Sequence, residues 1–222
     1  MIVYLNIETL IGENFGMIDF RNRGINIDTT FRCTLECPSC MRADYKRRGM
    51  KYPGRDMPFE DFKKVADYFK SVQFCGQISD PIFNPYLIEM LEYCDKHKVK
   101  SLVNTAASQR KKEWYERAFN ANKETKWIFG LDGLPKDSHK YRIHQDGEHL
   151  FEMMKLGASL GNEVAWQYLV FNYNENDIET ARKLAKAHNI YFKLTYSGRW
   201  TDTMMKYKPT NPKHYLNSLR KI

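Results

Sequence analysis

This sequence lacks long apolar runs. Of its 222 residues, 42% are hydrophobic, yet no stretch approaches the roughly 18 consecutive apolar residues that a membrane-spanning helix needs. The first residues also carry no basic lead of the kind that opens a secretory signal. We therefore expect a cytoplasmic protein without a membrane segment, long enough to bury the core of a single domain.

Cysteine is scarce as well. The sequence has five cysteines, and none follows Cys94. An odd count in a chain that is long enough to build an apolar core argues against a disulfide scaffold. Three of the five nevertheless lie close together, as Cys33, Cys37 and Cys40. This C-x3-C-x2-C spacing is the most specific feature of the sequence, and reduced thiols are available to bind a metal.

Negative charge is in deficit. The 35 Lys and Arg residues outnumber the 27 Asp and Glu residues, which leaves a net charge of +8. Such an excess favours an anionic partner or substrate, such as a nucleotide or RNA, although dispersed lysines are equally typical of a solvated surface. The cluster Lys46-Arg47-Arg48 follows the cysteines closely and is the one placed to face a substrate.

Strand and helix patterns alternate along most of the chain. Helical apolar faces occur near residues 58–70, 85–96, 114–119, 148–160 and 176–185, and β-type runs near 24–30, 71–76, 100–104, 127–132, 164–171 and 190–194. Parallel neighbours cannot be joined by a tight turn, so this alternation predicts an α/β protein with a parallel sheet. Within one domain covering 1–222, we expect a short N-terminal hairpin extension at 1–22, the α/β unit at 23–196 and a basic tail at 197–222, with a last helix near 214–221.

The three clustered cysteines predict a metal centre with an open position. Three thiolates on a short loop can hold three irons of a cubane [4Fe–4S] cluster, whereas a closed cluster needs a fourth protein ligand. An open coordination position distinguishes a catalytic metal centre from a structural one. The motif of Cys33, Cys37 and Cys40 resembles the signature of the radical S-adenosylmethionine (SAM) superfamily, in particular its MoaA/PqqE-like branch. The resemblance implies that these cysteines bind the cluster, that the free iron chelates SAM, and that SAM is cleaved to methionine and a 5'-deoxyadenosyl radical.

The same resemblance implies an architecture and partners. The superfamily core is a partial (β/α)6 barrel, which matches the six strand-and-helix units of this sequence. Sites of parallel barrels lie at the carboxyl ends of the strands, and the cysteines follow the first strand. A reductase or a flavodoxin-like protein is the implied electron donor. The implied substrate is a small molecule, a nucleotide or RNA, or a peptide.

Further candidate site residues follow the second and third strands. Gly76, Gln77, Ser79 and Asp80 resemble the Gly-Gly-Glu-Pro segment that binds the amino group of SAM in this superfamily. A glycine there lets the backbone approach a ligand closely, and free carbonyls accept hydrogen bonds from an ammonium group. Thr105 comes at the end of the third strand, where its hydroxyl is suited to a ribose or a carboxylate.

Later strands contribute three more candidates. Asp132 and Arg142 resemble the Asp-Gly and Tyr-Arg pattern of related enzymes. Asp132 is a candidate acceptor for a ribose hydroxyl, and Arg142 is a candidate bidentate clamp for the carboxylate of SAM or for an anionic substrate. Gln167, in the fifth strand, is a candidate polar contact around the nucleoside.

Two alternative interpretations stay open. Cys37 and Cys40 have the spacing of half a zinc site, and Cys94 and His97 have that of the other half. The protein would then be a zinc-stabilised, basic nucleic-acid-binding protein without catalysis. Cys94 also fits a small core residue in an apolar helical pattern, however, and zinc leaves Cys33 unexplained. The second alternative is a radical SAM fold that binds a cluster but serves as a partner protein.

Overall fold

The computed structural model describes residues 21–51 and 54–216. Its strands are β1 (Gly24–Ile27), β2 (Ser71–Phe74), β3 (Lys100–Thr105), β4 (Lys126–Gly130), β5 (Glu163–Leu169) and β6 (Tyr191–Thr195). They form one six-stranded sheet in chain order, and every neighbouring pair is parallel. Each crossover therefore adds the next strand on the same side, which produces an open barrel. The predicted α/β class and partial (β/α)6 barrel are confirmed, and the predicted hairpin lies almost entirely outside the described residues.

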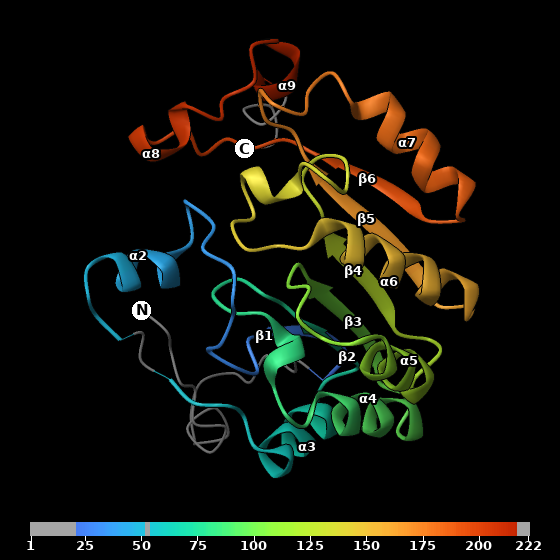
Figure 1. Ribbon diagram of the computed structural model, residues 1–222. Helices are drawn as coiled ribbons and strands as arrows, with labels where there is room; N and C mark the ends of the chain where they lie inside the picture. The colour runs from blue at the N-terminus through green and yellow to red at the C-terminus, as the bar shows by residue number, and fades with distance from the viewer. Residues whose placement is uncertain (1–20, 52–53, 217–222) are drawn as a thin grey trace.

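Helices fill the crossovers between the strands. They are α2 (Met41–Arg47), α3 (Phe59–Tyr68), α4 (Leu87–Lys96), α5 (Lys112–Ala121), α6 (Gly147–Ser159) and α7 (Ile178–Ala187), with short turns η1 (Pro81–Phe83), η2 (Ser138–Lys140), α8 (Asp202–Met205) and α9 (Lys213–Leu216). Helices α3 to α7 follow the outside of the curved sheet, whereas α2 and α8 lie on the side to which the strands point (Figure 1). The sequence pattern predicts α3 to α7, but not α2, η1, η2 or α8, because these are too short to show an apolar period.

Side chains of each strand alternate between two environments. Val103 in β3 and Trp166 in β5 are fully buried in the main apolar core beneath the outer helices. Their neighbours Asn104 and Gln167 point to the other face, where they line a pocket. Because the period of a strand is two, the parallel register decides which side chains enter that pocket.

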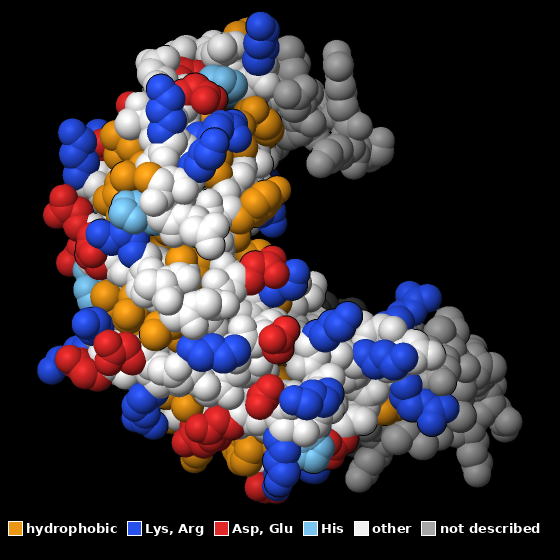
Figure 2. All heavy atoms as spheres, turned by 90° about the vertical axis from the view of Figure 1, so that its right-hand side faces the viewer, with side chains coloured by type: hydrophobic (Ala, Val, Ile, Leu, Met, Phe, Trp, Pro, Cys, Tyr) orange, Lys and Arg blue, Asp and Glu red, His pale blue; other side chains and the backbone are white. Residues whose placement is uncertain are grey.

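The helical face of the molecule is a mixed-charge surface. Seen from this side, the molecule has a C-shaped outline with a deep hollow, and basic side chains are interspersed with acidic ones (Figure 2).

In the predicted basic cluster, Lys46 pairs with Glu36 and Arg48 pairs with Asp44. The charge of that cluster is therefore largely neutralised by its neighbours.

No helix in the described part of the chain has both the length and the apolar character needed to cross a bilayer.

Candidate functional site

A pocket of about 720 Å³ opens at the carboxyl ends of the strands. Residues from the loop after β1 through to the segment after β6 line it. The predicted site residues among them are Cys33, Cys37, Cys40, Gly76, Gln77, Ser79, Asp80, Thr105, Arg142 and Gln167. The structure thus brings together every predicted site residue except Asp132, which is 0% exposed.

The cysteine loop, residues 33–40, presents its three thiols from a short turn. The Cys40 N–H donates to the Cys37 carbonyl (3.0 Å), and Cys40 is the N-cap residue of α2. All three thiols are free, and each cysteine is half-buried. Leu35, only 2% exposed, packs into the main apolar core and anchors the loop between two of the cysteines. This arrangement holds three sulfur donors on one wall of the pocket.

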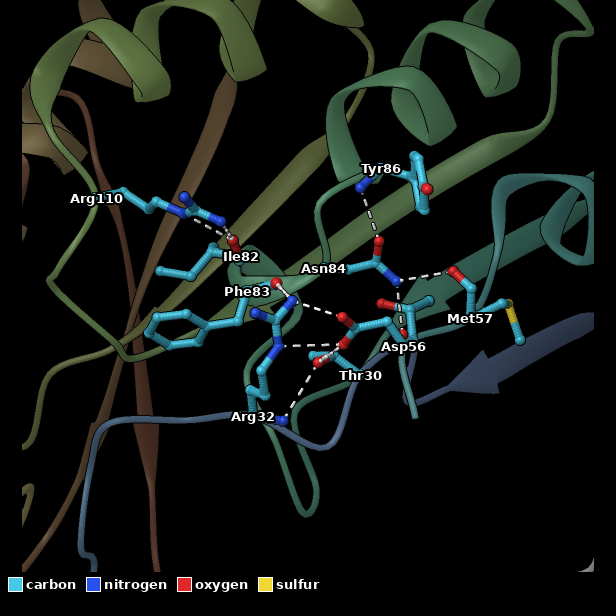
Figure 3. Close-up of polar contacts among 10 residues, drawn as sticks. Thr30, Arg32, Asp56, Met57, Ile82, Phe83, Asn84, Tyr86 and Arg110 are labelled. Carbon is cyan, nitrogen blue, oxygen red and sulfur yellow. Dashed lines mark hydrogen bonds and ion pairs between the residues drawn. The ribbon is translucent and has the colours of Figure 1, made fainter. Parts of the chain in front are cut away.

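Hydrogen bonds close the base of the segment that carries the cysteines (Figure 3). The Met57 N–H donates to the Thr29 carbonyl (2.8 Å), and Thr30 Oγ1 donates to Asp56 Oδ1 (2.5 Å). Arg32 forms an ion pair with Asp56 (2.6 Å). Asp56 lies just before α3, whose N-cap residue is Pro58, but its side chain does not cap the helix, because it is engaged by these two residues instead. The chain entering the cysteine loop is therefore fastened to the chain leaving α2.

Asn84 links this base to the turn after β2. Its side chain is almost fully buried, and Nδ2 donates to the carbonyls of Thr29 (2.6 Å) and Met57 (3.2 Å). Its Oδ1 accepts from the Tyr86 N–H (2.8 Å), as Figure 3 shows. The bond with Tyr86 is local, whereas the bonds to Thr29 and Met57 reach two other segments. One buried amide therefore holds the loops after β1 and β2 in a fixed relation.

The tip of the cysteine loop is tied to the loops after β3 and β4. Thr34 Oγ1 donates to Gln109 Oε1 (2.5 Å), and Gln109 Nε2 donates to the His144 carbonyl (3.1 Å). The Glu36 N–H donates to the Ile143 carbonyl (3.2 Å). His144 has a φ of 73°, a region that few non-glycine residues adopt. The loop is thus fixed at its base and at its tip.

Asp80 builds the wall of the pocket. It is 3% exposed, and its Oδ1 accepts from Thr105 Oγ1 (2.8 Å) and the Ile82 N–H (3.3 Å). Its Oδ2 accepts from the N–H groups of Ala106 (2.7 Å) and Ala107 (2.8 Å). Burial raises the pKa of Asp80, and these hydrogen bonds oppose the shift. Two predicted cofactor contacts therefore bond to each other, which fastens the loop after β2 to the end of β3.

Gly76 leaves space at the edge of the pocket. A Cβ there would lie 2.7 Å from the Ser79 carbonyl oxygen and 3.5 Å from that of Asn104. The first distance is shorter than any normal contact, so a side chain at this position would distort the loop between Gly76 and Ser79, whereas the distance to Asn104 is an ordinary contact. Ser79 Oγ itself donates to Asp28 Oδ1 (2.9 Å). At this edge the backbone beside Gly76 and the side chain of Gln77 are what a ligand meets.

Arg142 enters the pocket from the loop after β4. Its Nε donates to Asp132 Oδ2 (2.7 Å), and Asp132 Oδ1 accepts from the Leu169 N–H (3.0 Å). Burial opposes the charge of Arg142, but the ion pair with Asp132 raises its pKa above the ordinary value. The guanidinium also lies beside Cys37, whose pKa is raised by burial and lowered by this positive charge. The sequence predicts a ligand contact for Asp132; in the structure its carboxylate is buried and bonded to Arg142, and it does not line the pocket.

Several solved structures are similar to this one. SuiB from Streptococcus suis, bound to SAM, is 17% identical over 91% of this chain and 46% of its own, with a TM-score of 0.72. Methylornithine synthase (PylB) is 11% identical over 87% of this chain and 59% of its own, with a TM-score of 0.59. TYW1 with a lysine–pyruvate adduct is 14% identical over 83% of this chain and 71% of its own, with a TM-score of 0.57. All three are radical SAM enzymes.

The chain has the radical SAM core fold. At these identities the likeness concerns the fold, and the chain spans about half the length of SuiB. No family model matches the sequence, and no curated protein matches it either.

The thiols of the cysteine loop provide a donor set that fits three irons of a cube. Cys33, Cys37 and Cys40 all line the pocket, and all three are free. Three thiolates would leave the fourth iron of a [4Fe–4S] cube without a protein ligand. No group of three His, Cys, Asp or Glu side chains that could bind a single metal ion occurs within residues 21–51 and 54–216.

The zinc site considered from the sequence does not form. Cys94 is 0% exposed on α4, in the main apolar core. His97 follows α4 and stacks on Tyr93, with ring centroids 4.0 Å apart. Cys37 and Cys40 instead face the pocket beyond the strand ends. The structure contradicts this zinc site, and the interpretation of Cys94 as a core residue is confirmed.

Burial raises the pKa of two of the pocket thiols, Cys33 and Cys37. Burial, followed by the negative charge of Asp80, raises the pKa of Cys33 to about 12, and the positive charge of Arg42 opposes the shift. Metal coordination deprotonates a thiol outright.

The sequence analysis missed the wall that follows β6. The residues of this wall that line the pocket are Thr195, Tyr196, Ser197, Gly198, Arg199 and Met204. Residues 197–222 are expected from the sequence only as a basic tail. The available signal was positional, because residues 195–199 follow a strand at the same edge as the other site loops. Arg42 and Tyr141 also line the pocket without having been predicted.

Proposed function

We propose that this chain is the catalytic core of a radical SAM enzyme, in which Cys33, Cys37 and Cys40 bind a [4Fe–4S] cluster. The observation that carries the proposal is that three free thiols of one short loop share a pocket with the strand ends of a radical SAM core fold. When bound, the cluster supplies the electron that cleaves SAM to methionine and a 5'-deoxyadenosyl radical, which abstracts hydrogen from the substrate. The protein supplies binding, orientation and protection from water.

Residues of the other loops orient SAM in this proposal. Free backbone carbonyls beside Gly76 accept hydrogen bonds from its amino group. Arg142, which Asp132 holds in place, binds its carboxylate. Gln167 bonds to the nucleoside from the floor of the pocket. Thr105 already donates its hydroxyl proton to Asp80, so it contacts a ligand as an acceptor.

The proposal extends to substrate, electron donor and location. The proposed substrate is a small molecule, a nucleotide, RNA or a peptide. The structure of SuiB bound to its precursor peptide SuiA supports a peptide as one of these substrates. A reductase or flavodoxin-like protein is the proposed donor. Thiolate ligands persist in a reducing compartment, so the cytoplasm is the proposed location. We treat residues 1–222 as one radical SAM domain.

Anaerobic reconstitution tests the proposal. We expect about four irons and four sulfides per chain, and 5'-deoxyadenosine after addition of SAM and dithionite. Replacing Cys33, Cys37 and Cys40 together by alanine should abolish both. Cys94→Ala is the matched control, since this cysteine lies in the apolar core, and it should retain the iron.

Two results would contradict the proposal. Equal iron content in the triple variant and the wild type would show that the cysteine loop does not hold the cluster. An intact cluster that forms no 5'-deoxyadenosine would reject catalysis and favour the partner-protein interpretation.

A further inference from the structure

The pocket wall after β6 carries an arginine that has no carboxylate partner among residues 21–51 and 54–216. Arg199 lines the pocket. Its side chain forms no ion pair with any residue in the described part of the chain, and its backbone N–H donates to Ser197 Oγ (3.1 Å). A guanidinium held at a pocket wall without a counter-ion is suited to an anionic ligand, because its planar array of donors matches an oxyanion.

Positive charge exceeds negative charge around the pocket. The charged side chains that line it are Arg42, Arg142, Arg199 and Asp80. Asp80 is engaged by protein donors on both oxygens, and Asp132 balances Arg142 from behind. Arg42 and Arg199 remain, and neither has an ion-pair partner among the described residues. The pocket therefore favours more anionic charge than its own carboxylates supply.

The three arginines occupy different positions around the pocket. Arg42 donates to the Leu35 carbonyl and is close enough to Cys33 to lower its pKa. Arg142 likewise lowers the pKa of Cys37 by its positive charge. These two arginines border the cysteine loop and are suited to the anionic cluster and the carboxylate of SAM. Arg199 comes from the segment after β6, at the other end of the strand order from β1, which the cysteines follow.

Tyr141 and Arg199 both line the pocket. Tyr141 is 7% exposed. Burial raises its pKa to about 12, and the positive charges of Arg142 and Arg199 both act against this shift. The positive charge of Arg199 thus acts on a tyrosine that lines the same pocket.

Hydroxyl groups beside Arg199 complete a set of donors. Thr195 lines the pocket at the end of β6, and its Oγ1 is buried without a hydrogen-bond partner among the described residues. Ser197 Oγ accepts the N–H of Arg199, which leaves its own O–H free to donate. A buried hydroxyl without a partner is costly unless a ligand or water satisfies it. Two hydroxyl donors and a guanidinium on one wall are a recognition set for an oxyanion.

We propose that Arg199, with Ser197 and Thr195, binds an anionic group of the substrate, either a carboxylate or a phosphate. The inference rests on the proposed function, in which Arg142 serves SAM and the wall after β6 is left for the substrate. It narrows the substrate to a molecule that carries a carboxylate or a phosphate and presents it to this wall.

Anion binding to the reconstituted protein tests the inference. Inorganic phosphate and succinate are titrated at constant ionic strength, by calorimetry, with saturating SAM and no reductant; succinamide is the neutral control ligand. Arg199→Gln removes the charge, Arg199→Lys keeps it, and Arg182→Gln is the control, since Arg182 lies on α7 and pairs with Glu179. We expect wild type and Arg182→Gln to bind one of the two anions saturably and succinamide not at all. Arg199→Gln should bind that anion about tenfold to a hundredfold more weakly, with Arg199→Lys in between.

The two anions distinguish a phosphate from a carboxylate as the recognised group. Equal affinity in wild type and Arg199→Gln would overturn the inference, as would absence of saturable binding of both anions to the wild type. Anion binding that occurs only without SAM would assign the site to the carboxylate of SAM and would also overturn it. Because the titration requires no turnover, its outcome is independent of the 5'-deoxyadenosine assay that tests the proposed function.

Discussion

Replacing Asp132 by asparagine keeps the size of the side chain and removes its negative charge. Asp132 is 0% exposed, and the Arg142 side chain with which it pairs at 2.7 Å is 19% exposed. Removing one partner of a buried ion pair costs about 3–5 kcal/mol, because the other charge stays buried without compensation. Arg142 keeps some contact with water in the pocket, so we expect the lower end, about 3 kcal/mol.

Urea unfolding of the metal-free protein under anaerobic, reducing conditions measures this loss. With an m value of about 2–3 kcal/mol/M, the midpoint should fall by about 1–1.5 M. Glu179→Gln on α7 is the matched control, because it removes the charge from a pair whose side chains are 47% and 72% exposed. That control should change the stability by less than about 0.5 kcal/mol.

A double-mutant cycle decides whether the two residues are coupled. Arg142→Gln alone should destabilise the protein, and the double variant Asp132→Asn/Arg142→Gln should lose less than the sum of the single losses. We expect a coupling energy of about 2–3 kcal/mol. If the two losses are additive, or if Asp132→Asn is as stable as Glu179→Gln, Asp132 does not hold Arg142 and the positioning role assigned to it is refuted.

Three further substitutions test other parts of the site. Gly76→Ala places a Cβ 2.7 Å from the Ser79 carbonyl oxygen, so it should cost about 1–3 kcal/mol and weaken SAM binding in calorimetry; an unchanged SAM affinity would show that this loop does not bind SAM. Asn84→Ala removes three hydrogen bonds at a 1% exposed position and should cost about 2–4 kcal/mol in urea unfolding; a loss within about 0.5 kcal/mol would contradict its role in fastening the cysteine loop. Burial opposes ionisation of Glu175, but hydrogen bonds led by the one from Thr210 lower its pKa below 4.5. A carboxyl group whose pKa is lower in the folded state than in the unfolded state stabilises the fold at any pH above its unfolded pKa, and this contribution is lost as the pH falls through the folded pKa. Thermal scans between about pH 3 and 7 should therefore show a steeper loss of stability on the acid side in wild type than in Glu175→Gln. Parallel curves would refute the assignment.

The sequence alone determined the fold class and the cysteine motif. Both are local properties: helix and strand periods appear within about ten residues, and the spacing of Cys33, Cys37 and Cys40 places three thiols on one short loop whatever surrounds it. Parallel strands place their carboxyl ends at one edge of the sheet, so loops such as the one at Gly76 were predictable members of one site. The core position of Cys94 followed from the helical period around it.

Tertiary structure decided what each of those residues contacts. Asp132 and Asp56 are carboxylates with plausible local roles, as a ligand contact and as a helix cap. The actual partner of Asp132 is Arg142, 10 residues away, and that of Asp56 is Arg32, 24 residues away. The wall containing Arg199 joined the pocket only because the sheet curves until its last strand faces the first loop. Local periodicity carries no information on such distant pairings, because they depend on strand register and sheet curvature, which are set by packing of the whole sheet against its helices.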